Sequence, residues 1–387
     1  MRVLVVGGGV SGLAVARALI ADGHQVCVFE RAPGLRPTGG AVTLWSNGIA
    51  VLYALGVDYS GVGCEVETFD AARSDGRPIW HVDVRAIRRR LGFGALTIPR
   101  SRLVERLAAG LPDTVVSFGG DVTAVETDER SARITLDDGR TIDGDVVIGA
   151  DGNRSIVRRQ LIDPVDAALT GWITWQGLAP IDHPLTHGKL GVNVIGAEGI
   201  CGIIPAGDGL LQWWFEIRRP SSDLVPDQSV QMLRERFGSW RGPAREILEL
   251  ISDAEYFVHV RHRVPPVWGT SRSTLVGDSA HAMPPALAQG ANQSLEDAWV
   301  LAKMLRATDL AASLRAYERA RRRRVATVSR VAMVATTRQD GVMRRVARLP
   351  SGPTTYAYGL ALKTASTVLS RRGLWQPSRE RAGWTHA

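Results

Sequence analysis

The sequence predicts an α/β fold, in which a doubly wound parallel sheet receives an inserted antiparallel sheet and is followed by C-terminal helices. Three observations support this prediction. The chain opens on a short apolar strand, Val3–Val6, that runs into glycines and a helix. An apolar strand that ends at glycine and aspartate recurs twice, at 146–151 and 274–278, which is typical of buried parallel strands. Between these repeats, residues 165–270 carry short candidate strands separated by glycine and proline turns, which indicates an antiparallel sheet.

The first thirty residues have the spacing of a dinucleotide-binding unit. Gly7 makes the tight turn after the strand, Gly9 lets a pyrophosphate approach the backbone, and Gly12 allows close packing of the helix on the strand. The helix begins at about Ser11, and its N-terminus attracts an anionic group. A second strand ends at Glu30, where a carboxylate can accept hydrogen bonds from a ribose. Together these features predict that the chain binds a dinucleotide.

The 387-residue chain has the composition of an ordinary globular protein, with 45% hydrophobic and 22% charged residues. No stretch of eighteen uncharged apolar residues occurs, so no transmembrane helix is predicted. Met1 and Arg2 lead directly into the first strand, which argues against a signal peptide. The three cysteines are scattered and odd in number, which indicates a reducing compartment and no metal site. We therefore expect a cytoplasmic protein.

The net charge of +8 and the arginine-rich run at 319–324 raise the question of nucleic-acid binding. Arginine supplies almost all of the basic charge, and it is dispersed along the chain. This pattern favours a solvated helix face and a general attraction of anionic cofactors and substrates. We expect no nucleic-acid partner.

Turn residues and apolar periodicity predict the remaining elements in order. After Glu30, residues 31–40 form a loop in which Arg31 and Arg36 could meet phosphates. The predicted helices and strands are a helix at 47–55, short strand-like segments to about 98, a helix to 109, strands at 115–118 and 122–136, a strand to 150, a helix at 155–161, strands at 169–179, 190–196, 200–204 and 210–218, helices at 227–238 and 243–251, a strand at 273–276, and helices at 291–305 and 310–335.

These elements divide the chain into four parts. We predict a first part of the dinucleotide domain at 1–164, with a short β-rich insert at about 60–100. An antiparallel-sheet substrate domain at 165–270 and a return segment of the first domain at 271–310 follow, and C-terminal helices fill 311–387.

Three strand-ending motifs occur in this order across almost the whole chain: the glycines at 7–12, Asp151-Gly152 within 149–155, and Gly277-Asp278 within 277–285. The stretch Gln289–Ala298 continues the third motif. The combination resembles the single-component FAD-dependent aromatic hydroxylases of the p-hydroxybenzoate and salicylate hydroxylase type. The resemblance implies an FAD domain of the glutathione reductase type with non-covalent FAD.

The resemblance also implies roles for individual residues. Asp278 would bind ribityl or ribose hydroxyls of FAD, and Asp151 would serve FAD and the passing nicotinamide nucleotide. Amides at a helix N-terminus would stabilise negative charge on the reduced flavin. The full implied set adds Arg36 and Arg100 near the cofactor, Pro284 against the flavin, and the amides of Gly290, Ala291 and Asn292. Two alternatives are open: Asp151 could cap the following helix, and Asp278 or His281 could be turn residues.

The implied function is an NAD(P)H- and O2-dependent monooxygenase that hydroxylates an apolar, aromatic small molecule through a C4a-hydroperoxyflavin. Epoxidation or Baeyer–Villiger oxygen insertion on the same cofactor is the first alternative, and a non-catalytic interaction protein is the second. Only one G-x-G-x-x-G follows a strand, so the nicotinamide nucleotide should bind transiently over the FAD domain, through Arg31, Arg36 or Arg154.

Tryptophans in the predicted sheet suggest where a ring-containing substrate would bind. Alternation along 210–218 places Trp213 on one face of its strand, and we predict that Trp213, Gln176 and Trp45 line a cavity above the flavin. Plain core packing of Trp213 is the alternative. No side chain stands out as a catalytic base, and the sequence identifies neither the substrate nor the oligomeric state.

Overall fold

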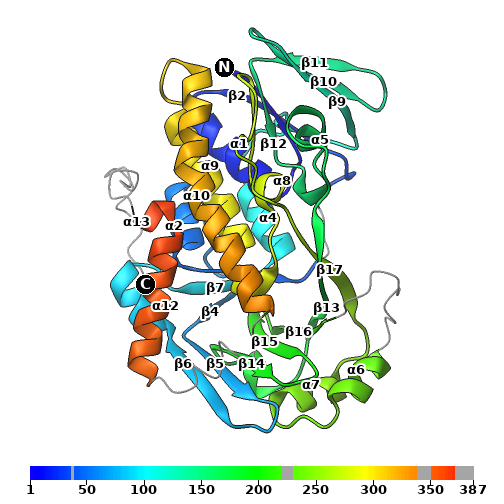
Figure 1. The fold of residues 1–387 in the computed structure, drawn as a ribbon, viewed down its shortest axis with the longest axis vertical. Helices are drawn as coiled ribbons and strands as arrows, with labels where there is room; N and C mark the ends of the chain where they lie inside the picture. The colour runs from blue at the N-terminus through cyan, green and yellow to red at the C-terminus, as the bar shows by residue number, and fades with distance from the viewer. Residues whose placement is uncertain (36–38, 219–229, 338–349, 371–387) are drawn as a thin grey trace.

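The computed structural model describes residues 1–35, 39–218, 230–337 and 350–370 (Figure 1). Figure 1 shows an elongated molecule with the N-terminal parallel sheet near one end and a large sheet at the other. The long helix α10 (Leu310–Thr337) runs along one side, and α12 (Ser351–Ala365) lies toward the large-sheet end. Arg36 falls outside the described ranges.

The parallel sheet is built from five strands that meet in the order β18-β12-β1-β2-β8, and every pair is parallel. Two of its central strands, β12 and β1, are apolar runs that are almost fully buried, because helices cover both faces. The bounds are β1 (Arg2–Val6), β2 (Gln25–Glu30), β8 (Val116–Phe118), β12 (Val146–Gly149) and β18 (Ser273–Leu275), with α1 (Val10–Ala21) packed on α9 (Gly290–Met304). The predicted doubly wound domain is confirmed.

The large sheet contains seven strands in the order β17-β13-β16-β15-β14-β5-β6. The strands are β5 (Thr68–Arg73), β6 (Pro78–Asp83), β13 (Ala168–Pro180), β14 (Leu190–Ile195), β15 (Ile200–Gly207), β16 (Leu210–Arg218) and β17 (Glu255–Arg261). Two helices, α6 (Val230–Phe237) and α7 (Pro243–Leu250), cover one face through a shared hydrophobic cluster. The four strands predicted between 165 and 220 are present, and β17 was not predicted.

One edge of this sheet corrects the predicted pairing. The β5–β6 hairpin comes from the early insert, and β5 pairs with β14 in parallel. The sheet is therefore mixed rather than purely antiparallel, and the segment 165–270 does not build it alone. Pairing with β5 satisfies backbone groups that β14 would otherwise leave open at an edge.

Two smaller sheets and six further α-helices make up the rest of the described α-helices and strands. Two three-stranded sheets have the orders β3-β7-β4 and β11-β10-β9. Their strands are β3 (Ala41–Leu44), β4 (Cys64–Val66), β7 (Ala95–Pro99), β9 (Val122–Thr127), β10 (Ala132–Leu136) and β11 (Thr141–Gly144), and the helices are α2 (Ser46–Ala54), α3 (Val84–Leu91), α4 (Arg100–Ala108), α5 (Ile156–Leu161), α8 (Asp278–His281) and α13 (Thr367–Ser370). Within the described ranges, no helix is both long and apolar enough to cross a membrane.

Helix α3 lies where only short strands were expected. Asp83 caps it by accepting a hydrogen bond from the amide of Ala86, and Gly92 ends it in the left-handed conformation. These two signals stand in the sequence, but the arginine-rich face between them hides the apolar periodicity. The helix was therefore missed.

Candidate functional site

The turn between β1 and α1 places its three glycines as the motif requires. Gly7 has a φ of 103°, and a Cβ there would lie 2.5 Å from the carbonyl oxygen of Ala150. A Cβ at Gly12 would collide with the carbonyl oxygen of Gly7, so the helix packs directly on the turn. Gly9, in contrast, faces open space. The turn therefore exposes backbone at the N-terminus of α1, where a diphosphate can approach.

Glu30 lies against this glycine turn. Its carboxylate accepts hydrogen bonds from the amides of Gly8, at 2.8 Å, and Ala32, at 3.0 Å. These two bonds fix the carboxylate at the end of β2 and leave further lone pairs for a ligand hydroxyl. The arrangement fits the predicted ribose contact.

The third strand end packs on the first. Gly277 has a φ of 59°, and a Cβ there would collide with the side chain of Ser11 at the start of α1. The amide of Gly277 donates to Asp297 at 2.8 Å, and Asp278 follows as an exposed residue at the start of α8. The chain thus brings Ser11 and Asp278 together beside the glycine turn, and we call this edge of the parallel sheet the cofactor crevice.

The carboxylate of Asp151 is engaged with the protein itself. It accepts hydrogen bonds from the amide of Ile156, at 2.7 Å, and from the hydroxyl of Ser279, at 3.1 Å. Burial raises the pKa of Asp151, against the opposing effect of its hydrogen bonds, among them one with Ser155. This is the capping alternative for α5, and a nucleotide role for Asp151 stays a prediction.

The N-terminus of α9 offers free amides. The first intrahelical bond runs from the amide of Gln293 to Gln289, so the amides of Gly290, Ala291 and Asn292 have no partner within the helix. The side chain of Asn292 is used structurally: it accepts from the amide of Trp45 at 2.8 Å and donates to the carbonyl oxygen of Thr43 at 3.0 Å. The amides can therefore act on a ligand while the side chain holds β3 beside α9.

Three further predicted cofactor residues lie at the ends of helices and strands. Arg100 is exposed at the start of α4, and its amide donates to Gly40, next to the segment that contains Arg36. Arg31 is exposed just after β2, and Pro284 is buried after α8. No described contact yet assigns a ligand to any of them, so their roles stay predictions.

The prediction that Trp213 and Gln176 line one cavity is wrong. Gln176 pairs with Trp214 across β13 and β16, so Trp213 faces the other side of the sheet. Trp213 is buried in the cluster under α6 and α7, and its ring lies over Gly177. Trp214 instead lies over Gly202 and joins a cluster with Trp45. The alternative of core packing therefore holds for Trp213.

The face that carries Trp214 lies against β3 and the cluster that contains Trp45. Gln212 accepts a hydrogen bond from the amide of Ala41 in β3 at 2.6 Å, and its amide nitrogen lies 3.5 Å from Gln176. Trp45 packs on Tyr358 with ring centroids 5.0 Å apart, and its indole nitrogen is buried without a partner among the described residues. Gln176 and Trp45 thus lie near β3 and its neighbours, and a substrate role for either residue stays a prediction.

Two buried titratable groups share this face. Glu216 is 5% exposed, and burial raises its pKa to about 7. Across the β13 strand, His259 bonds Thr174 at 2.6 Å, and burial lowers the pKa of His259 to about 4. A carboxyl that is about half ionised near neutral pH and a neutral imidazole therefore lie in a buried setting, where each can exchange hydrogen bonds with a ligand. Sequence reasoning missed both, because alternation alone does not say which face meets the cofactor.

Comparison with known proteins identifies the cofactor that binds in this crevice. Residues 1–332 match a protein family described as "FAD binding domain". The chain belongs to this FAD-binding family. Its relatives include the aurachin C monooxygenase/isomerase of Stigmatella aurantiaca, with 31% identity over 83% of this chain and 85% of that protein.

Two further relatives and a solved structure extend the comparison. An FAD-dependent urate hydroxylase of Mycolicibacterium vanbaalenii is 29% identical over 84% of this chain and 85% of its own length. A chloroplastic zeaxanthin epoxidase of Spinacia oleracea is 32% identical, but this chain spans only 54% of it. The fold matches Klebsiella pneumoniae HpxO, solved with FAD and uric acid, with a TM-score of 0.87, 22% identity and coverage of 94% and 97% of the two chains.

The predicted membership of the single-component FAD aromatic hydroxylases is confirmed, and the chain is an FAD-dependent, NAD(P)H-using monooxygenase. The residues present fit FAD: open backbone at Gly9, a fixed carboxylate at Glu30 and unpaired amides at Gly290 and Ala291. FAD supplies the oxygen chemistry when bound. The protein's part is to bind, orient and shield it.

Proposed function

We propose that this monooxygenase hydroxylates an apolar, ring-containing small molecule that lies on the Trp214 face of the large sheet. Two electrons from NAD(P)H and one proton balance the reaction, in which one oxygen atom of O2 enters the substrate and the other leaves as water. Urate and aminohydroxybenzoate, named as substrates of relatives, are both ring compounds. We place the enzyme in the cytoplasm on its cysteine pattern.

The observation that supports this proposal is the chemistry of the face itself. Trp214 offers a flat apolar surface, while Gln176 and Gln212 offer amide groups beside β3. Glu216 adds a buried carboxyl. A buried carboxyl that repels an anion but accepts a hydrogen bond favours a substrate with an N–H or O–H group over a carboxylate. With a pKa near neutrality, Glu216 can also hold the proton that such a group releases.

Epoxidation is a second candidate, because an epoxidase is among the relatives. The same face would then position a carbon–carbon double bond rather than an aromatic ring. The two reactions differ in their products, although both add one oxygen atom.

The test is to purify the protein with its flavin and screen ring compounds for those that accelerate NAD(P)H oxidation. Mass spectrometry should find a product heavier by one oxygen atom, and its fragmentation separates a hydroxyl from an epoxide. Basic and neutral heteroaromatic compounds should outperform their carboxylated analogues. A purified protein that binds no flavin, or flavin whose reoxidation gives only hydrogen peroxide with every compound, would overturn the proposal.

A further inference from the structure

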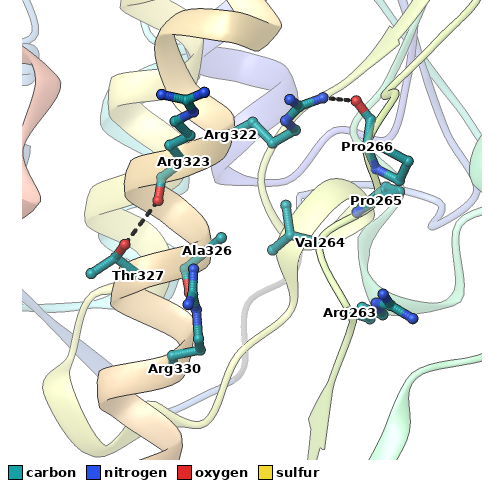
Figure 2. A pocket seen from close by; sticks show the side chains of 9 residues that line it. All are labelled: Arg263, Val264, Pro265, Pro266, Arg322, Arg323, Ala326, Thr327 and Arg330. Atoms are coloured by element: carbon teal, nitrogen blue, oxygen red, sulfur yellow. Dashed lines mark hydrogen bonds between the residues drawn. The ribbon is translucent and has the colours of Figure 1, made fainter.

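Figure 2 shows a groove between α10 and the segment that follows β17, and its chemistry is unused by the site described above. The groove encloses about 590 Å³ and is lined by Arg263, Val264, Pro265, Pro266, Arg322, Arg323, Ala326, Thr327 and Arg330. Four of these nine residues are arginines, and none is acidic. A cavity with this charge attracts anions.

The arginines keep guanidinium donors for an anion, although Arg322 and Arg330 each also donate to a backbone carbonyl oxygen. None of the four forms an ion pair with a carboxylate of the described residues, and Arg263, Arg323 and Arg330 are exposed. Arg322 donates across the groove to the carbonyl oxygen of Pro266, which joins the two walls. Planar guanidinium groups pair with phosphate oxygens in a two-point geometry that lysine cannot offer.

The spacing suits a ligand with more than one phosphate. Arg322, Ala326 and Arg330 follow one another at four-residue intervals, so they share one side of α10. The rise of a helix separates the first and last by about 12 Å. Ala326 leaves room between the two charged side chains, and Arg263 belongs to the opposite wall (Figure 2).

The groove borders the cofactor crevice. The residue before Arg263, His262, donates its amide to Ala282 at 2.9 Å, two residues before Pro284. The ring of His262 bonds the carbonyl oxygen of Asn153, beside Arg154. A dinucleotide held by its phosphates in the groove could therefore extend a ring toward the predicted flavin position.

We propose that this arginine groove binds the phosphates of NAD(P)H while its nicotinamide reaches the flavin. The inference rests on the proposed function, because it presumes an NAD(P)H-driven reaction in this crevice. It moves the main phosphate contacts from the predicted Arg31, Arg36 and Arg154 to the wall formed by α10. Binding through a surface groove also agrees with the single dinucleotide motif in the chain.

The experiment compares Arg323→Ala, Arg330→Ala and the double variant Arg323→Glu/Arg330→Glu with the wild-type holoenzyme. Arg319→Ala is the matched control, because Arg319 is exposed on the same helix and does not line the groove. Anaerobic mixing with NADPH or NADH gives a Kd from the concentration dependence of flavin bleaching. Each alanine variant should raise this Kd about tenfold, and the double variant more. FAD content, the limiting reduction rate and the substrate Kd should match wild type.

The outcomes separate the two proposals. An unchanged Kd for both nucleotides in the double variant would overturn the groove assignment while the wild-type hydroxylation stands. Loss of FAD, or a raised Kd for the ring substrate alone, would also overturn it, because the groove would then serve another anion. If wild-type flavin is not bleached by either nucleotide, the proposed function itself fails.

Discussion

Glu216 and His259 lie on one buried face of the sheet and have opposite effects on the pH dependence of folding stability. The folded-state pKa of Glu216 is about 7, above its ordinary 4.5, so between these values the folded protein binds more protons than the unfolded chain, and stability falls as pH rises. The folded-state pKa of His259 is about 4, below its ordinary 6.5, so stability rises with pH over that interval. Each effect corresponds to roughly 3 kcal/mol, and the two nearly cancel.

Replacing one of these two groups should therefore reveal the pH dependence of stability that the other contributes. In Glu216→Gln, the free energy of unfolding should rise by roughly 3 kcal/mol between pH 4 and 6.5, relative to the wild-type curve, because only His259 still titrates. Urea denaturation of the holoenzyme at four pH values in this interval would measure it. Parallel curves for wild type and variant would show that Glu216 does not titrate as a buried acid.

Strand β16 shows what alternation predicts and what it leaves open. The sequence correctly separates Trp213 from Trp214, because successive side chains point to opposite faces. It does not say which face α6 and α7 cover, because that depends on residues that follow in the chain and on the distant β3 strand. The glycine turns were predictable because their backbone geometry is local, whereas the sheet face and the β5–β14 pairing depend on contacts distant in sequence.

Replacing Trp213 and replacing Trp214 should consequently affect different properties of the protein. Trp213→Ala removes a buried ring from the helix-covered core and should cost about 3–5 kcal/mol of unfolding free energy. Trp214 lies on the opposite face of the sheet, beside the cluster that contains Trp45. Trp214→Ala should therefore raise the KM of the ring substrate with little loss of FAD. Denaturation, flavin content and steady-state kinetics of both variants test this contrast. A raised KM in Trp213→Ala with unchanged stability would mean that the substrate pocket lies on the face that carries Trp213.

One arginine of the run at 319–324, Arg321, holds together helices from distant parts of the chain. The sequence predicts a solvated face for 319–324, yet the side chain of Arg321 on α10 is fully buried against α9 and α13. It donates to Glu296 and Asp297, each at 2.6 Å, and to the hydroxyl of Thr367. Burial alone would raise the pKa of Asp297, but His281 and Arg321 hold it below its ordinary value. A single guanidinium thus joins the C-terminal helices to the return segment of the FAD domain.

This junction also supports the cofactor crevice, because Asp297 accepts the amide of Gly277 just before Asp278. Arg321→Met would leave two carboxylates buried without their shared cation, which costs about 3–5 kcal/mol. We expect a lower free energy of unfolding and a higher dissociation constant for FAD, while Arg319→Met, at an exposed neighbour, changes neither. Fluorescence titration of the apoprotein with FAD measures the second effect where the fold persists. Reduced stability with wild-type FAD affinity would mean that the buried cluster stabilises the fold without positioning Asp278.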